Sequence, residues 1–552
     1  MDATEKKDPC PPPQEPGFSR DIALALSGGG YRAAAFHLGV LDLLDRVGLL
    51  SRVTTVSTIS GGTIVGAAYA VSLLRNEPFP DFYKRFYAAL RDTNVVDAAL
   101  ADLEDDHKTA QGETAVMSLS RAAARVYARD EFVGDARMGD LRAMAEGDST
   151  EGSARGPSEW VFSATELTDG TAFRFQTSSR NRCATGGGSA TVPKSVADTI
   201  RVADAVAASS CFPGAFEPLG FPHDFVWDRP LSEVCRDLGT CRDPEDIQGE
   251  DGRGEAKAFP VGLMDGGVFD NQGVDGVRTV YRRSERDHQP GLFLASDTSR
   301  TKTPMALFSS AERQGGPTLG DTWTQVKTWG WRAGILLILL LAISIAAVVW
   351  IPLARAWAAL GAVALVAAIV LARLGWQYVW PLVQQGLGWI QSRTGVPVWE
   401  RVRGIARADL ARLVAVRVES VYALLTSVFG KRVRSLTQTS IFESDTYASV
   451  YADALITHLS KEGRKQRSAG PEPSKALRAL IDQCLDVPTT LWASESDLKS
   501  LVAGGQANAC HTLLVFAEKA RSDPETASIA AELKAFWDII QVDPQRFVRP
   551  VR

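Results

Sequence analysis

The chain has 552 residues, of which 45% are hydrophobic and 23% charged, and its formal net charge is −5. These values exclude intrinsically disordered, collagen-like and disulfide-scaffold proteins, which are poorer in apolar residues or much richer in glycine or cysteine. The small negative charge gives no sign of a nucleic-acid-binding protein.

A proline-rich stretch opens the chain, and we expect a disordered tail over residues 1–19. The first predicted strand is residues 21–26, which lead into three consecutive glycines and a helical pattern. Glycines at a helix start let several backbone N–H groups face one concavity, which stabilises negative charge. Gly28, Gly29 and Gly30 are therefore candidates for an anion-binding loop, although structural turns and nucleotide-binding loops also use glycines.

The second predicted strand, residues 53–59, is β-branched and leads directly to Ser60 at the start of another helix. This is the outline of a nucleophile elbow, in which a sharp strand-to-helix turn exposes the serine hydroxyl. Gly61 and Gly62 allow the strand and the helix to approach closely, whereas Thr58 stands where such elbows usually have a first glycine. A serine that merely caps the helix is the alternative interpretation.

Further strands follow along the same region. Residues 160–167 and 172–177 flank an Asp-Gly pair and predict a hairpin, and residues 291–298 read as a buried strand. Strands that alternate with helices predict an α/β domain over 20–300 with a mostly parallel central sheet. Residues 219–259 hold ten acidic against five basic side chains, which predicts an acidic surface insertion in the form of a solvated loop.

A third candidate element is Asp265-Gly266-Gly267, which follows an apolar approach. An aspartate held at a strand end by glycines can act as a general base on a serine. A calcium loop is the competing interpretation, but the carboxylate spacing does not fit one. Of the six histidines, His223 and His288 are possible triad members by position, but both lie in polar loop sequence with no motif around them. His37 stands one turn into the helix after the glycines and is expected to be packed rather than catalytic. A Ser–Asp dyad therefore explains the chain better than a triad.

The middle of the chain is strongly apolar. Residues 333–354 contain no charge and thirteen Leu, Ile or Val, which favours membrane insertion by about 4 to 8 kcal/mol. Residues 356–372 are shorter and rich in alanine, and become plausible as a span when packed against the first. We therefore predict a transmembrane helical hairpin over 333–374, preceded by a polar linker over 301–332.

Charge predicts the orientation of this hairpin. Its turn carries only Arg355, whereas residues 393–434 hold nine Arg or Lys against three acidic residues. The positive-inside rule then places both soluble regions in the cytoplasm. Residues 375–552 are expected to be mostly helical and to pack on the α/β domain over 20–300. Within them, residues 397–429 form an amphipathic pattern that suits either anionic headgroups or solvent.

The seven cysteines are scattered, and no two have CxxC spacing. This pattern predicts neither a zinc site nor a redox motif and favours reduced thiols in a reducing compartment. We expect no bound metal and no cofactor.

The motifs SGGGYR, TISGG and DGGVFDNQG, in this order, resemble those of the patatin-like phospholipase family across about residues 20–300. The segment SSCFPGAFEP at 209–218 and the run FSATELTDG are similar to two further family segments. The resemblance implies a three-layer α/β fold and a serine lipid acyl hydrolase that needs no metal or cofactor. Membrane lipids would then be both substrate and anchor, with no role for nucleic acid.

Carried over residue by residue, the resemblance implies Ser60 as the nucleophile and Asp265 as its base. It also implies Arg32 as support for an oxyanion loop, and that loop would consist of Gly28, Gly29 and Gly30. Ala33 and Thr58 depart from the usual glycines, and Thr58 is expected to crowd the elbow. A catalytically weak or inactive patatin-like membrane scaffold is the alternative function. A serine peptidase or soluble-ester hydrolase is a second alternative, against which the apolar hairpin argues.

Overall fold

The computed structural model describes most of the chain between residues 15 and 299 and between residues 447 and 551. The described residues are 15–109, 118–146, 156–178, 185–187, 190–213, 215–239, 260–283, 289–299, 447–466 and 469–551, with single positions between 317 and 444. Residues 1–303 and 427–552 form one unit of the fold, and residues 304–426 form a second. Both predicted spans of the 333–374 hairpin, the 301–316 part of the linker and most of 397–429 lie outside the described residues. Among the helices that are described, none is long and apolar enough to cross a membrane.

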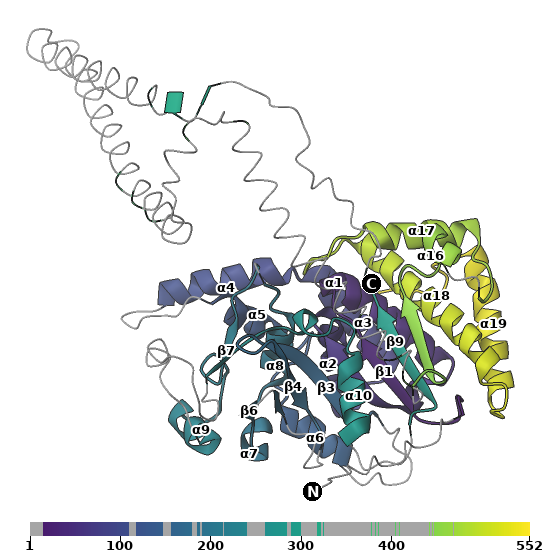
Figure 1. Ribbon diagram of the computed structural model, residues 1–552, viewed down its shortest axis with the longest axis horizontal. Coiled ribbons are helices and arrows are strands. Elements are labelled where there is room, and N and C mark those ends of the chain that lie inside the picture. The colour runs from purple at the N-terminus through teal and green to yellow at the C-terminus, as the bar shows by residue number, and fades with distance from the viewer. Residues whose placement is uncertain are drawn as a thin grey trace, which may run out of the picture. The chain divides into compact units, whose positions relative to one another are not determined.

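A ten-stranded sheet runs through the first unit (Figure 1). Its main path is β10-β9-β1-β2-β3-β4-β5-β6, while β8 pairs with both β3 and β7. The strands are β1 (Ile22–Leu26), β2 (Val53–Ile59), β3 (Glu159–Glu166), β4 (Thr171–Gln176), β5 (Gly186–Gly187), β6 (Ala190–Thr191), β7 (Leu219–Phe221), β8 (Val261–Asp265), β9 (Leu292–Asp297) and β10 (Tyr451–Leu455).

The sheet is mixed, which corrects the prediction of a mostly parallel one. Strands β10, β9, β1, β2 and β3 are mutually parallel. The connections from β1 to β2 and from β2 to β3 include helices, as parallel neighbours require. The pairs β3–β4, β3–β8, β4–β5, β5–β6 and β7–β8 are antiparallel. The hairpin turn between β3 and β4 accounts for the first of these pairs, and the others have no signal in the local sequence.

Helices cover both faces of the sheet. They are α1 (Gly30–Arg46), α2 (Gly61–Leu74), α3 (Phe79–Asp92), α4 (Val95–Thr109), α5 (Leu119–Tyr127), α6 (Met138–Glu146), α7 (Lys194–Ala197), α8 (Val202–Ser210), α9 (Leu231–Leu238), α10 (Val274–Arg283), α16 (Lys461–Gln466), α17 (Lys475–Asp486), α18 (Glu495–Lys519) and α19 (Thr526–Val542). Short 3₁₀ helices occupy Leu50–Arg52 and Gly266–Val268.

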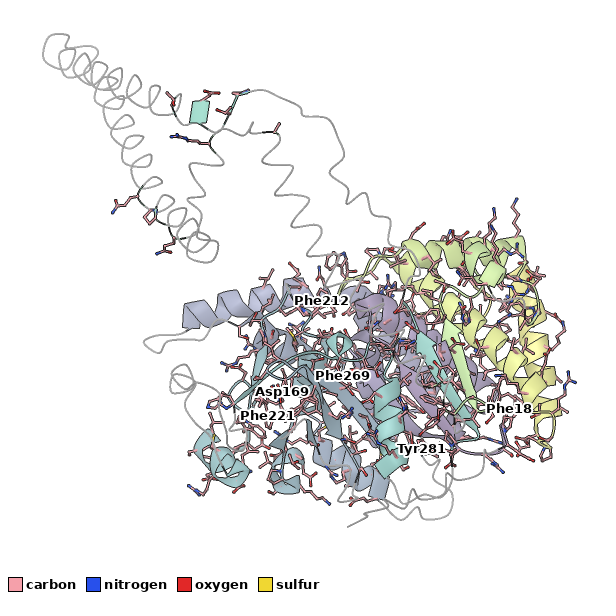
Figure 2. All side chains as sticks on the ribbon, viewed as in Figure 1. Phe18, Asp169, Phe212, Phe221, Phe269 and Tyr281 are labelled. Atoms are coloured by element: carbon pink, nitrogen blue, oxygen red, sulfur yellow. The ribbon has the colours of Figure 1, made fainter. Side chains whose placement is uncertain are left out.

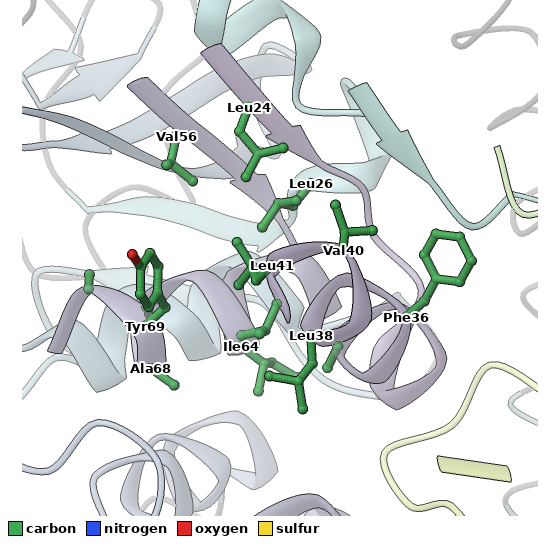
Figure 3. Packing of buried hydrophobic residues seen from close by; sticks show 14 of the residues in the cluster. Leu24, Leu26, Phe36, Leu38, Val40, Leu41, Val56, Ile64, Ala68 and Tyr69 are labelled. Atoms are coloured by element: carbon green, nitrogen blue, oxygen red, sulfur yellow. The ribbon is translucent and has the colours of Figure 1, made fainter. Parts of the chain in front are cut away.

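Alternating strand residues divide the core into two layers. Leu24 and Leu26 of β1 and Val56 of β2 face the side on which Leu41 of α1 and Ile64 of α2 pack (Figure 3). The alanines of β1 face a second, smaller cluster formed with α10, β9 and β10. The molecule thus has helix, sheet and helix layers, as the α/β class requires.

The C-terminal region contributes directly to this core. Strand β10 extends the parallel part of the sheet beside β9, with Tyr451 opposite Phe293. Helix α18 packs along α1, where Gly39 lies so close to α18 that a Cβ would come 2.0 Å from the Val502 carbonyl oxygen. The sequence predicts that residues 375–552 pack on the domain over 20–300, but it predicts neither β10 nor the pairing of α18 with α1.

The prediction of a disordered tail over residues 1–19 is wrong for its last residues, 15–19. Phe18 is fully buried, and its ring lies against that of Phe516 in α18. Figure 2 labels Phe18. The Gly17 N–H donates to the Gly291 carbonyl, and the Ser19 N–H donates to Asp523. Residues 15–19 therefore belong to the fold, because the ring of Phe18 is buried against α18. The composition of the segment does not indicate this burial.

The acidic segment is also partly folded, so the prediction of a solvated loop over 219–259 is wrong for residues 219–239. Strand β7 pairs with β8, and Phe221 and Phe225 are buried. Their rings lie against Phe173 and Phe175 of β4. Burial of these aromatic side chains holds the segment on the sheet. The prediction considered only the charged residues and therefore missed it.

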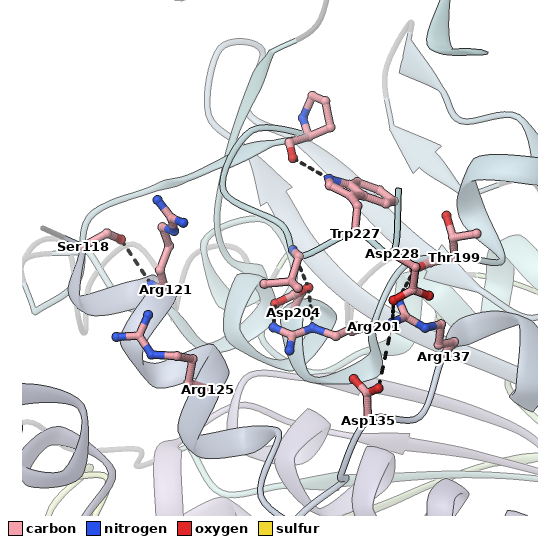
Figure 4. A network of polar contacts seen from close by, with 12 residues as sticks. Ser118, Arg121, Arg125, Asp135, Arg137, Thr199, Arg201, Asp204, Trp227 and Asp228 are labelled. Carbon is pink, nitrogen blue, oxygen red and sulfur yellow. Dashed lines mark hydrogen bonds and ion pairs between the residues drawn. The ribbon is translucent and has the colours of Figure 1, made fainter. Parts of the chain in front are cut away.

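Polar contacts fasten the same segment to α8 (Figure 4). Arg201 forms a bidentate pair with buried Asp204, and Asp204 also accepts the Val226 N–H at 3.1 Å. The indole N–H of Trp227 donates to the Pro222 carbonyl at 2.9 Å. The bonds from Arg201 and Val226 satisfy the buried carboxylate of Asp204. The bond from Trp227 closes the turn that carries the aromatic cluster.

One prediction about the cysteines is contradicted. Cys235 is disulfide-bonded, so the expectation of reduced thiols is wrong for this residue. Cys211, Cys484 and Cys510 are free and buried.

Candidate active site

Ser60 lies at the turn between β2 and α2 in a strained backbone conformation. Its φ is 50° and its ψ is −118°, a combination that non-glycine residues adopt at a cost of order 1–3 kcal/mol. The Ser60 carbonyl already accepts the N–H groups of Thr63 and Ile64, at 2.8 and 3.1 Å. The helix therefore begins at the serine itself, which is the geometry of a nucleophile elbow.

Close packing explains the two glycines after the serine. A Cβ on Gly61 would lie 2.1 Å from the Gly30 carbonyl oxygen, and one on Gly62 would lie 2.3 Å from that of Leu26. Both distances are well below van der Waals contact. The elbow consequently sits directly against the glycine loop at the end of β1.

Strand β3 brings Asp265 to the elbow. Ile59, just before Ser60, pairs with Ser163, while Asp265 at the end of β8 pairs with the next residue, Ala164. Since β4 occupies one edge of β3 at these positions, β2 and β8 share the other edge and meet end to end. Two motifs far apart in sequence thus meet at one point of the sheet.

The Asp265 carboxylate is buried and hydrogen-bonded to the Ser60 side chain. It also accepts the Gly267 N–H at 2.7 Å, while the Asp265 N–H donates to the Cys211 carbonyl at 3.1 Å. A Cβ on Gly266 would lie 2.3 Å from the Ser163 carbonyl oxygen, so this position needs glycine. Gly266 and Gly267 thereby hold the carboxylate at the strand end.

Burial raises the pKa of Asp265 to about 6, against the opposing hydrogen bonds from Ser60 and Gly267. Such a value suits a general base, because the carboxylate is ionised at neutral pH yet still binds a proton readily. No histidine is among the groups recorded as acting on this carboxyl in the described residues. His223 is described but not among those groups, and His288 lies outside the described residues.

The glycine loop can supply two hydrogen-bond donors. Gly29 and Gly30 have φ of 141° and 57°, which only glycine adopts without strain. Among the described residues, no acceptor is recorded for their N–H groups, which open helix α1. The Gly28 N–H is different, because it donates to the Asn271 carbonyl at 2.9 Å. Gly28 is therefore not a third donor; a Cβ there would instead meet Asn271 and Ser60.

The loop between α17 and α18 holds the glycine loop from outside. The Thr490 carbonyl accepts the Tyr31 N–H at 2.8 Å, and a Cβ on Gly30 would lie 2.3 Å from its oxygen. Buried Arg32 donates to the Val487 carbonyl at 3.3 Å, so it links the two loops. Sequence reasoning missed Thr490 and Val487, because a backbone carbonyl carries no side-chain signal.

His37 supports the glycine loop from inside and is fully buried. Its Nε2 lies 3.0 Å from the Ser27 carbonyl oxygen and its Nδ1 lies 2.9 Å from the Ser296 hydroxyl. A carbonyl oxygen only accepts, so Nε2 carries the proton. Burial lowers the pKa of His37 to about 4, and the ring is neutral at physiological pH.

Thr58 fits the elbow without displacing it. Its side chain is fully buried, and its methyl group would lie 2.6 Å from a Cβ on Gly66, so Gly66 makes room for it. The Thr58 hydroxyl lies 2.9 Å from that of Thr63. The expected crowding is thus relieved one turn along α2.

Metal binding has no support in the described part of the chain. No group of three His, Cys, Asp or Glu side chains there is placed to hold a metal ion. The chemistry available at this site is that of a serine, a carboxylate and two backbone donors.

If Asp265 is the general base for Ser60, its pKa predicts the pH dependence of catalysis. Because only the ionised carboxylate can take the serine proton, kcat/KM should rise about tenfold per pH unit below pH 6 and level off above pH 7. Asp270 provides a matched control, since burial also raises its pKa to about 6 but its carboxylate accepts the N–H groups of Gln272 and Asp275. Asp270→Asn should keep the inflection of kcat/KM near pH 6. If the inflection disappears in that variant, it belongs to Asp270 and not to Asp265.

Comparison with known family models identifies one family. The family model described as patatin-like phospholipase matches residues 24–278. Human GIVD cytosolic phospholipase A2 is 16% identical over 51% of this chain and 46% of its own, with a TM-score of 0.33. The structure of the same enzyme in complex with methyl gamma-linolenyl fluorophosphonate and terbium chloride is 20% identical over 28% of this chain and 23% of its own, with a TM-score of 0.20. The chain thus spans less than half the length of these structures, and no curated protein matches it.

Proposed function

Residues 24–278 form a patatin-like phospholipase domain, and on that premise we propose that the chain is a serine hydrolase that cleaves acyl esters of membrane lipids. One observation carries the proposal. The hydroxyl of strained, buried Ser60 is hydrogen-bonded to a carboxylate whose pKa is about 6, beside a loop with two unpaired N–H groups among the described residues. This combination suits acyl transfer.

In the first half of the reaction, the Ser60 Oγ attacks the ester carbonyl carbon while Asp265 accepts its proton. The negative charge that forms on the carbonyl oxygen is stabilised by the N–H groups of Gly29 and Gly30, at roughly 2.7–4 kcal/mol per donor. The tetrahedral intermediate then breaks its bond to the alcohol oxygen. That oxygen takes the proton from Asp265, and the acyl group remains on Ser60.

In the second half, water attacks the acyl carbon and gives its proton to Asp265. The ester bond to Ser60 breaks, and the proton returns from Asp265 to the Ser60 oxygen. The fatty acid leaves, and both residues regain their starting states. No metal or cofactor takes part in the proposed cycle.

A panel of lipids tests the proposed activity. The full chain, reconstituted in vesicles, is incubated with a phospholipid, a lysophospholipid and a triacylglycerol, and released fatty acid is measured. We expect release from at least one of these lipids and none from the Ser60→Ala variant under the same conditions. If wild type and Ser60→Ala release equal amounts from every lipid, the proposal fails and a scaffold role takes its place.

The second part of the proposal is a membrane anchor formed by residues 333–374. It rests on the uncharged run over 333–354 and on the alanine-rich run over 356–372. An anchor would keep the active site beside a substrate that is scarce in bulk water. The basic residues after the second run favour a cytoplasmic position for both soluble regions, whereas disulfide-bonded Cys235 favours an oxidising compartment.

Reporter fusions decide between these placements. Fusions at Arg332 and Arg393 should both report the cytoplasm, and a fusion at Arg355 should report the opposite side, because a hairpin returns the chain to the side it left. Opposite signals at Arg332 and Arg393 would exclude a two-span anchor. Two matching but extracytoplasmic signals would keep the hairpin and reverse its orientation, as the disulfide favours.

A further inference from the structure

A chain of buried hydroxyl groups lies behind the nucleophile elbow. The Thr58 Oγ1 is 2.9 Å from the Thr63 Oγ1, which is 2.8 Å from the Ser209 Oγ at the end of α8. The Ser209 Oγ is 2.6 Å from the Ser163 carbonyl oxygen and 3.0 Å from the Ser60 backbone nitrogen. The three hydroxyl-bearing residues are fully buried.

The directions of these hydrogen bonds follow from their end point. The Ser163 carbonyl can only accept, so the Ser209 hydroxyl donates its single proton there. Ser209 then uses its oxygen lone pairs to accept the Ser60 N–H and the Thr63 hydroxyl. Thr63 in turn accepts the Thr58 hydroxyl, so every member of the chain has a partner.

The end of α8 contacts both residues of the proposed dyad. Ser209 accepts the N–H of Ser60, and two residues later the Cys211 carbonyl accepts the N–H of Asp265 at 3.1 Å. One short backbone segment therefore sets the positions of both main chains. The spacing between the nucleophile and its base depends on this segment as well as on β3.

We propose that Ser209 is a positioning residue for the nucleophile: its hydroxyl holds the strained Ser60 backbone so that the Oγ stays in line with Asp265. The inference rests on the proposed function, in which Ser60 is the nucleophile. Without this bond, the turn at Ser60 can relax towards an ordinary φ and move the Oγ. Displacements of about 1 Å at a reacting atom can cost about a hundredfold in rate.

Ser210 provides a matched control on the same helix end. It is also buried, but its hydroxyl donates to the Val206 carbonyl of its own helix at 2.8 Å. Its other recorded contact is the Tyr127 hydroxyl at 3.4 Å. Removing the Ser210 hydroxyl therefore tests the general effect of losing a buried hydroxyl at this place.

The experiment measures how fast a soluble alkyl fluorophosphonate modifies Ser60 in the full chain, along with kcat and KM for ester hydrolysis. Ser209→Ala should slow the modification and lower kcat by about 10- to 100-fold, with KM changed less than threefold. Ser210→Ala should stay within twofold of wild type in all three quantities. Thermal unfolding of both variants shows whether stability changes track the rates.

Three outcomes would overturn the inference. The first is wild-type reactivity in Ser209→Ala, and the second is an equal slowing in Ser210→Ala. The third, absence of any Ser60 adduct in wild type, would refute the proposed function itself, whereas the first two leave it standing. If Ser209→Ala does not fold, Ser209→Cys replaces it, because the thiol is a weaker acceptor of similar size. That variant should be slowed about 3- to 10-fold, and wild-type reactivity there would also overturn the inference.

Discussion

Replacing either member of the proposed dyad should stop the proposed reaction, and replacing both should cause no further loss. We expect Ser60→Ala and Asp265→Asn each to lower kcat by about 10⁴-fold or more, with no further loss in the double variant. The losses do not add because the base is useful only while it accepts the Ser60 proton. Initial rates of ester hydrolysis by the three variants check this; a double variant about 10⁴-fold slower than either single one would show two independent functions.

The stability of Asp265→Asn should carry a pH signature. The pKa of Asp265 is about 6 in the fold, raised from an ordinary value of 3.8, so the folded state favours the protonated form. The stability that the fold gains from holding Asp265 in its protonated form is fully present below pH 3.8 and is lost as the pH rises through 6. Two pH units correspond to about 3 kcal/mol, and Asp265→Asn should gain up to this amount relative to wild type at pH 8 but not at pH 4. An equal effect at both pH values would contradict the raised pKa.

The second large effect concerns the glycine loop. Gly30→Ala would place a Cβ 2.3 Å from the Thr490 carbonyl oxygen at a φ of 57°. The loop must then shift, and the N–H of residue 30 moves away from the oxyanion. We expect kcat to fall about 10²- to 10³-fold, the usual loss when one oxyanion donor is removed.

Gly170→Ala is a control that separates the loss caused by the contact with Thr490 from the loss caused by backbone strain. It has a similar φ of 65° in the β3–β4 turn, where a Cβ would meet nothing within 4 Å. Gly170→Ala should therefore share the conformational cost of roughly 1 kcal/mol but keep kcat within twofold. Both variants are compared by initial rates and by chemical unfolding. Similar losses of kcat in both would show that Gly30 matters only for its backbone freedom.

The elements nearest the site were the most predictable from the sequence. Strands β1 and β2 are short apolar or β-branched runs that end in glycine or serine turns, and α2 begins at Gly61, directly after Ser60. The β3–β4 hairpin forms at Asp169-Gly170, where Gly170 has a positive φ. In each case the signal is local, because the period of apolar residues and the turn residues lie within one element.

Pairings between distant segments could not be predicted in this way. Strand β10 joins β9 across more than 150 residues, and the α17–α18 loop reaches the glycine loop from the far end of the chain. The buried aromatic rings of 219–239 were hidden by the acidic composition around them. These contacts depend on shape complementarity, which has no periodicity in the sequence.

The site shows the same division. Ser60, Asp265 and the glycines were predicted as site residues because their motifs resemble those of a family, and β3 brings the ends of the Ser60 and Asp265 strands together in the fold. The Gly28 N–H donates to the Asn271 carbonyl, so only two candidate donors to an oxyanion remain in the glycine loop. This bond could be found only in the structure. The carbonyls of Cys211 and Thr490 were equally invisible, because any residue type supplies a carbonyl.

The most direct test of the account is to locate the covalent adduct that a lipid-like fluorophosphonate forms with the full chain. Peptide mapping by mass spectrometry should find one modified residue, Ser60, and the adduct should form more slowly as the pH falls below 6, where Asp265 becomes protonated. An adduct on another residue, or none on Ser60 at pH 8, would contradict the account.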